Sequence, residues 1–190
     1  MPQGKALLEQ WLAGEDKAFE AFYDRYADFV FQLCMRLLQN KEEAEELCQD
    51  IFLKVADKAN SFKGDSTTTT WLYAIASRKC LDRLRQRKRK SYAVWNQRAQ
   101  AKEDTLAFVD SNNPQTDLEK AEQMHHFWQA MEQLPPRQKV AITLVFLEGL
   151  PQKKAAEVLG IPLKSLESLL QRGKKNLKQR LHSPTNEGNY

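Results

Sequence analysis

Hydrophobic residues recur every three or four positions from Asp16 to Leu38, which is the period of an amphipathic α-helix. The same period resumes at Ala44 and continues to Asn60. Asn40, with Glu43 three positions later, has the spacing of a capping box before this second segment. The pattern predicts two long helices that pack against each other through their apolar faces.

A polar segment covering residues 62–70 then interrupts the helical period, because glycine and β-branched threonine disfavour a helix. Apolar positions resume at Trp71 and continue to Leu84, so a polar loop is expected to lead into a third long helix that ends near Lys90. Four shorter helices are expected in the second half, at residues 117–133, 136–147, 151–159 and 163–181. No segment alternates with the period of a strand, and the predicted fold class is all-α.

The two sets of helices are separated by residues 91–116, which are polar and end in a turn-favouring run before Pro114. Thr116, with Glu119 three positions later, forms a second capping signal. We therefore predict two small helical domains, residues 1–90 and 117–182. A flexible linker over residues 91–116 would join them, and a disordered tail over residues 183–190 would follow.

Composition adds little to this picture. Lys and Arg number 29 against 25 acidic residues, and a net charge of +4 is too small to indicate a polyanionic partner by itself. Cys34, Cys48 and Cys80 form no C-x-x-C pair and fall in apolar helical positions, so they are expected to be reduced core residues. No signal peptide is recognisable, and no run reaches the roughly 18 apolar residues of a membrane span. The sequence predicts a cytoplasmic protein without direct membrane insertion.

Catalytic chemistry is not indicated. His125, His126 and His182 have no Cys, Asp or Glu at metal-ligand spacing, and no glycine-rich phosphate loop is present. We expect no enzyme activity, no metal and no cofactor, and we interpret His125 and His126 as surface and packing residues of their helix.

Positive charge is concentrated at residues 78–90, on a helix that keeps Leu81 and Leu84 for the core. Such a stripe suits a phosphate backbone, because basic side chains displace condensed counterions and give salt-sensitive, sequence-independent affinity. The alternative is a solvated helix end whose cations offset the negative end of the helix dipole.

Residues 152–175 have the spacing of a helix-turn-helix. Ala155 or Ala156 would allow the two helices to approach closely, and Gly160 would supply a left-handed turn. The outer face of the second helix would then carry hydrogen-bonding groups that can read base edges in a major groove. The alternative is an ordinary helical hairpin.

Three stretches together resemble the extracytoplasmic-function group of sigma factors, from about Phe19 to Leu181. The first comprises residues 19–26 and 44–55, the second residues 62–66 and 70–76, and the third residues 134–138, 148–150 and the helix-turn-helix. The resemblance implies a sigma factor that binds core RNA polymerase and directs promoter-specific initiation. The first domain would dock on the polymerase clamp helices and open the promoter, and the second would hold the minus-35 element. It also implies an anti-sigma factor as a partner, in addition to promoter DNA.

The resemblance also assigns candidate residues to each surface. Polymerase contacts fall on Leu47, Gln49, Asp50, Phe52 and Leu53. Minus-10 contacts fall on Lys63, Asp65, Ser66, Thr67, Thr68, Thr69, Trp71, Tyr73, Arg78, Lys79 and Arg83. Minus-35 contacts fall on Lys164, Ser165, Glu167, Ser168, Gln171, Arg172, Lys174 and Lys175. Core packing is the alternative for Phe52 and Trp71, because both share a helical face with apolar neighbours.

Three positions depart from the family pattern. Arg78 stands where many members have Asn, and Glu167 stands where Lys or Arg is common, so promoter preference cannot be inherited. Pro162 replaces the usual Ser or Thr cap, but its fixed φ suits a first helical turn. Two other functions stay open at this point. A conventional helix-turn-helix regulator would normally add a dimerisation or sensor module, which the first ninety residues do not resemble, and a structural adaptor would not bind DNA.

Overall fold

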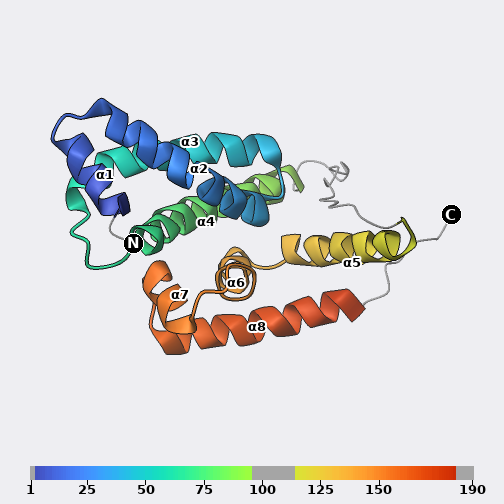
Figure 1. Cartoon of the computed structure of the whole chain (residues 1–190). Helices are drawn as coiled ribbons and strands as arrows, with labels where there is room; N and C mark the ends of the chain where they lie inside the picture. The colour runs from blue at the N-terminus through green and yellow to red at the C-terminus, as the bar shows by residue number, and fades with distance from the viewer. Residues whose placement is uncertain (1–2, 96–113, 183–190) are drawn as a thin grey trace.

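The computed structural model describes residues 3–95 and 114–182, and every regular element within these ranges is helical (Figure 1). Helices α1 to α4 form one layer, and α5 to α8 form a second layer on the other side of α4 (Figure 1). The prediction of an all-α fold is confirmed. The predicted tail and residues 96–113 of the predicted linker lie outside the described residues.

The first layer contains α1 (Gln3–Leu12), α2 (Asp16–Leu38), α3 (Lys41–Lys58), the short 3₁₀ helix η1 (Ala59–Ser61) and α4 (Thr68–Trp95). Helix α2 has the predicted bounds, and the predicted cap of α3 is confirmed because the Asn40 side chain accepts a 2.8 Å hydrogen bond from the Glu43 amide. Helix α1 was not predicted. A ten-residue helix is marginal alone, and this one is held by tertiary contacts, with Leu8 buried and Trp11 packed 4.7 Å from Phe19.

The polar loop before α4 is shorter than its composition suggests, because the helix begins at Thr68 rather than at Trp71. Thr67 explains the difference. Its hydroxyl accepts a 3.1 Å hydrogen bond from the Thr70 amide, and threonine is as favourable at a helix cap as it is unfavourable inside a helix. Helix α4 then continues five residues into the predicted linker.

The second layer contains α5 (Pro114–Glu132), α6 (Pro136–Ile142), the π-helical turn η2 (Thr143–Leu147), α7 (Gln152–Leu159) and α8 (Leu163–His182). Helix α5 begins three residues before the predicted start, so Thr116 lies inside it rather than at its cap. Proline is well suited to this first position, because its fixed φ is helical and its missing N–H would have had no partner there. The predicted helix 136–147 is α-helical only to Ile142 and then widens into the π turn.

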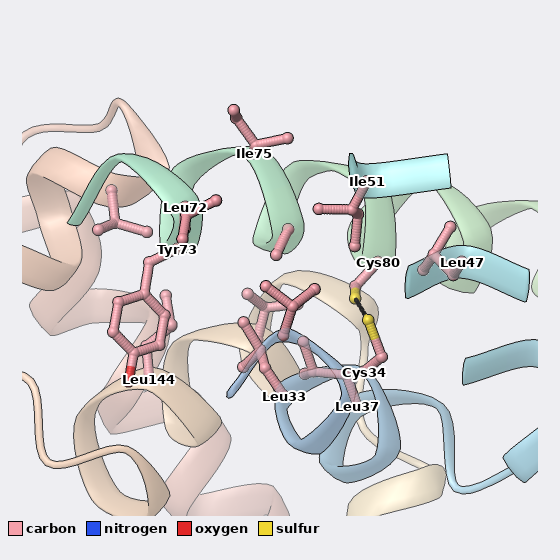
Figure 2. Close-up of a cluster of buried hydrophobic side chains, with 14 of the residues drawn as sticks. Leu33, Cys34, Leu37, Leu47, Ile51, Leu72, Tyr73, Ile75, Cys80 and Leu144 are labelled. Carbon is pink, nitrogen blue, oxygen red and sulfur yellow. Dashed lines mark hydrogen bonds between the residues drawn. The ribbon is translucent and has the colours of Figure 1, made fainter. Parts of the chain in front are cut away.

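One hydrophobic core runs through both layers. Leucine, isoleucine and cysteine side chains of α2, α3 and α4 meet in its centre, and Leu144 reaches it from the second layer (Figure 2). All three cysteines are buried, as predicted, and the Cys34 and Cys80 sulfurs lie 3.7 Å apart. The hydrogen bond from Cys80, together with burial, raises the pKa of Cys34, and burial raises the pKa of Cys48 to about 12. The Cys34 and Cys48 thiols are therefore neutral packing groups at physiological pH.

The two layers are joined by a buried carboxylate. Glu148 follows the π turn, and its side chain is only 6% exposed. It forms an ion pair with Arg36 of α2 and accepts a 2.9 Å hydrogen bond from the Tyr73 hydroxyl of α4. Near the other end of α4, the Lys88 ammonium donates to the Leu134 carbonyl at 3.2 Å. Helix α4 is thus held to the second layer at both ends of its contact with it.

We predict that Glu148→Gln lowers the free energy of unfolding by about 1.5–3 kcal/mol, the range for a hydrogen bond to a charged group. The amide can still accept from Tyr73, but it carries no charge to pair with Arg36. Urea denaturation followed by circular dichroism measures the change. Glu157→Gln is the matched control, because it breaks an exposed ion pair with Lys154 and should cost less than about 1 kcal/mol. Equal costs for both variants would contradict a role for Glu148 in joining the layers.

Candidate nucleic-acid interface

The helix-turn-helix has the predicted geometry. Gly160 ends α7 in the left-handed conformation, with φ 62° and ψ 38°, and its amide donates to carbonyls of the last turn. Ala155 and Ala156 are buried where α7 meets its neighbours. The Pro162 carbonyl accepts from the Ser165 and Leu166 amides, so the proline is compatible with the start of α8, as expected.

One face of α8 is packed and the other is exposed. Leu166 and Leu170 are buried, and a side chain at Gly173 would meet Ile142 at 2.7 Å, so α8 lies close against α6. The predicted minus-35 residues lie outside this contact. All eight are exposed: Lys164, Ser165, Glu167, Ser168, Gln171, Arg172, Lys174 and Lys175. The packing therefore leaves the predicted reading face of α8 accessible to a groove.

The two lysines near the middle of α8 differ in their surroundings. The Lys174 ammonium lies 4.3 Å from the centre of the Phe146 ring, and Phe146 is itself 47% exposed. A cation over an aromatic face is attracted by the ring quadrupole. Lys174 is thus partly engaged within the domain, and no such ring contact is seen for Lys175 among the described residues.

The polar loop before α4 borders a hollow of about 430 Å³, which we call the loop hollow. Its lining consists of Lys5, Phe62, Gly64, Asp65, Ser66, Thr67, Thr68 and Lys154. Three helical elements therefore meet around the loop, since Lys5 belongs to α1, Lys154 to α7 and Thr68 to α4. Polar groups beside the aromatic ring of Phe62 suit a single-stranded nucleotide.

The predicted minus-10 residues are not all on this surface. Lys63, Asp65, Thr67 and Thr69 are exposed, and Ser66 and Trp71 are half-buried. Thr68 and Tyr73 are buried, at 3% and 8% exposure. The centres of the Trp71 and Phe62 rings lie 4.8 Å apart, and those of the Tyr73 and Phe29 rings lie 4.7 Å apart. Each of these aromatic residues therefore has a packing partner within the protein. For Trp71 this agrees with the core-packing alternative.

The basic stripe of α4 is divided by its ion pairs. Arg83 forms two 3.0 Å hydrogen bonds with Glu46, and Arg87 bonds both Glu43 at 2.9 Å and the Leu38 carbonyl at 2.7 Å. The Arg83 guanidinium lowers the pKa of the Glu46 carboxyl, and the hydrogen bond from Arg83 has the larger effect. These two arginines thus connect α4 to the preceding helices. Arg78 is exposed and Lys79 is half-buried, without such pairs among the described contacts.

Helix α3 presents a second surface, which we call the α3 surface: Gln49, Asp50 and Leu53. Leu53 is an apolar side chain that is 69% exposed. Phe52 is 3% exposed and packs 4.7 Å from the Tyr23 ring, and Leu47 is 2% exposed. The structure therefore places these two residues in the core behind the α3 surface, which is the alternative interpretation of Phe52.

The histidines lie apart from any ligand cluster. Within the described part of the chain, no group of three or more His, Cys, Asp or Glu residues is arranged to hold a metal ion. His125 is half-buried and hydrogen-bonds Gln129 at 2.8 Å, whereas His126 is exposed. None of the described helices has the length and apolar character needed to cross a membrane.

Comparison with known proteins assigns both halves to related families. Residues 22–90 match the family model for sigma-70 region 2, and residues 126–177 match that for sigma-70 region 4. The chain is 28% identical over 180 residues to the extracytoplasmic-function RNA polymerase sigma factor SigW of Bacillus subtilis, covering 93% of this chain and 96% of SigW. It is also 28% identical over 181 residues to the RNA polymerase sigma-H factor of Pseudomonas aeruginosa, covering 94% of each protein.

Two solved structures share the fold. The sigma factor RpoE of Bartonella quintana, in complex with the anti-sigma factor NepR, aligns with a TM-score of 0.63 and 22% identity, covering 88% of this chain and 99% of RpoE. CnrH, in complex with the cytosolic domain of CnrY, aligns with a TM-score of 0.63 and 18% identity, covering 96% and 99% of the two chains.

Proposed function

This chain belongs to the sigma-70 family, in its extracytoplasmic-function group, and we propose that it serves as a sigma factor through the three surfaces described above. The observation that carries the proposal is that the matches to region 2 and region 4 cover separate helical layers with separate exposed surfaces. A helix-turn-helix regulator acting alone would leave the first layer, and its match to region 2, unexplained.

The proposed division of labour follows the predicted boundaries. Residues 1–90 bind core polymerase and open the minus-10 element, residues 117–182 bind the minus-35 element, and residues 91–116 connect them, with residues 183–190 as a tail. The protein acts in the cytoplasm and performs no catalytic chemistry of its own. Because RpoE, which shares this fold, was solved in complex with an anti-sigma factor, we also propose an anti-sigma factor for this chain.

Polymerase binding is assigned to the α3 surface. Leu53 exposes apolar area beside the carboxylate of Asp50 and the amide of Gln49. An apolar centre with a polar rim is the usual anatomy of a protein–protein interface. Phe52 and Leu47 support this surface from the core, so their contribution to binding is indirect.

Promoter opening is assigned to the polar loop and the start of α4. Lys63, Asp65, Ser66, Thr67, Thr69 and Trp71 would face the extruded strand, and Arg78 and Lys79 would contact phosphates. Extruding a base costs stacking energy that contacts in a polar and aromatic pocket can offset. Thr68, Tyr73 and Arg83 would act by holding this region in place, since each is buried or paired within the protein.

Minus-35 recognition is assigned to the exposed face of α8. Gln171 and Arg172 carry forked groups that can make two hydrogen bonds to one base edge. Glu167 can accept from a cytosine amino group but repels phosphate, so we assign it to base reading rather than to backbone contact. Lys175 is assigned to the phosphate backbone.

We predict that the wild-type chain directs core polymerase to discrete start sites on genomic DNA, and that Leu53→Ala weakens polymerase binding without changing the stability of the fold. Exposed substitutions usually change unfolding free energy by less than about 0.5 kcal/mol. Phe52→Ala is the contrasting variant, because truncating a buried phenylalanine costs about 3–5 kcal/mol. In vitro transcription maps the start sites, titration against core polymerase measures binding, and urea denaturation measures the free energy of unfolding. Wild-type polymerase affinity in folded Leu53→Ala would remove the α3 surface from the interface.

We predict that Asp65→Ala with Ser66→Ala impairs promoter opening and spares polymerase binding. These two positions are chosen because Thr67 caps α4 and Thr68 is buried, so changing either threonine would also disturb the helix. Permanganate reactivity of thymines reports opening. Asn60→Ala, an exposed change before the loop, is the control. Undiminished thymine reactivity in the double variant would make the loop a simple connector.

We predict that substitutions on α8 fall into two classes. Gln171→Ala or Arg172→Ala should cost about 1–3 kcal/mol on the cognate minus-35 element and relax preference at particular bases. Lys175→Ala should weaken binding to all sequences alike and reduce the log–log salt slope by about one unit. Titration of holoenzyme against matched and single-base-variant duplexes at several salt concentrations separates the classes. If Gln171→Ala and Arg172→Ala instead weakened binding to all sequences alike, and Lys175→Ala changed base preference, another face of α8 would enter the groove.

A further inference from the structure

Helix α1 is seated directly against the helices that carry the polar loop. A Cβ added at Gly4 would lie 2.4 Å from the Tyr26 hydroxyl of α2 and 2.7 Å from the Thr68 hydroxyl of α4. Contacts this short leave no room for a side chain, so the backbone of α1 fits closely where α4 begins. The first turn of α1 is thereby fixed next to the loop hollow.

Lys5 extends from this turn across the loop. Its ammonium donates to the Lys63 carbonyl at 3.4 Å, and a Cβ at Gly64 would lie 2.9 Å from both its Cδ and its Nζ atoms. Gly64 has a φ of 82°, a conformation that favours glycine. The lysine stem therefore lies against the loop backbone, and its charge lies at the edge of the loop hollow.

The Lys5 ammonium retains donor capacity. Lysine has three N–H donors. The Lys5 ammonium makes one long hydrogen bond, to the Lys63 carbonyl, and a 3.6 Å ion pair with Glu9. The Glu9 side chain is 64% exposed. The Lys5 side chain is itself 44% exposed. A solvent-screened pair of this kind contributes little, so a stronger anion can replace the Glu9 carboxylate.

The loop hollow is chemically asymmetric. Asp65 supplies a carboxylate that accepts from amino groups and repels phosphate, and Phe62 supplies a ring on which a base can stack. Lys5 supplies positive charge from α1, whereas the other lysine of the lining, Lys154 of α7, is paired with Glu157 at 2.8 Å. A volume of about 430 Å³ lies within the range of small-molecule sites. These groups favour a nucleotide with its base toward the loop and its phosphate toward α1.

We propose that Lys5 is a further nucleic-acid contact, which binds a backbone phosphate of the strand whose nucleotide enters the loop hollow. The inference rests on the proposed function, because it requires the loop to receive single-stranded promoter DNA. It adds helix α1 to the promoter-opening surface, which sequence reasoning confined to residues 63–83.

The test compares Lys5→Met with Lys5→Arg in reconstituted holoenzyme. Methionine retains an apolar stem that can lie over Gly64, and arginine retains the charge. The probe is a fluorescent single-stranded DNA carrying the non-template minus-10 sequence of a promoter mapped with the wild type. Lys5→Met should weaken its binding about three- to tenfold at low salt and reduce the log–log salt slope by about 0.7, the value for one phosphate on a single strand. Lys5→Arg should stay close to the wild type in both measurements.

Lys17→Met is the matched control, because Lys17 is exposed on α2 and does not line the loop hollow. It should leave affinity and salt slope unchanged. The proposal is overturned if Lys5→Met keeps the wild-type salt slope, even when promoter opening falls, because Lys5 would then only support the loop. It is also overturned if Lys17→Met changes both measurements as much as Lys5→Met does. Failure of the proposed function differs from both results, because the wild type itself would then fail to bind polymerase or the probe.

Discussion

Helix α4 packs against or bonds to other helices on several sides, and these contacts constrain the rest of the structure. Leu72 and Cys80 pack into the core of the first layer, while Tyr73 is bonded to Glu148 from the second. Arg83 and Arg87 are committed to acids of α3. Within the described part of the chain, exposed polar groups without such pairs remain in the loop before the helix, at Arg78, and at Arg89 and Lys90 near the end of the helix. The proposed promoter-opening surface lies where internal contacts leave polar groups available.

Local patterns in the sequence predicted those features that depend on local physics. The apolar period of α2, the Asn40 cap and the left-handed Gly160 each follow from neighbouring residues, and all three are present in the structure. Helix α1 could not be predicted in this way. It is short, and it depends on contacts with residues distant in sequence, such as Lys5 with Lys63 and the close approach of Gly4 to Thr68.

The candidate site residues also divide into features that local sequence patterns predict and features that depend on contacts between distant residues. Helical spacing showed that Phe52 could belong to the core, but not that Leu53 beside it would be 69% exposed. A basic run is visible in the sequence, whereas the pairing of Arg83 with Glu46, 37 positions away, depends on how α3 and α4 are placed. Charge alone therefore overstated the number of arginines available to DNA. The buried role of Glu148 had no local signal either, because its partners lie on α2 and α4.

The π turn η2 gives the contact between the layers a dependence on helical phase. The Glu148 amide donates to the Thr143 carbonyl five positions earlier, which adds one residue to the turn compared with an α-helix. Each residue of an α-helix advances the side-chain direction by about 100°. If the same residues followed the regular α-helical period, Glu148 would point about 100° away from its observed direction toward Arg36 and Tyr73. The docking of the layers thus depends on the width of one helical turn as well as on the identity of the residues that meet there.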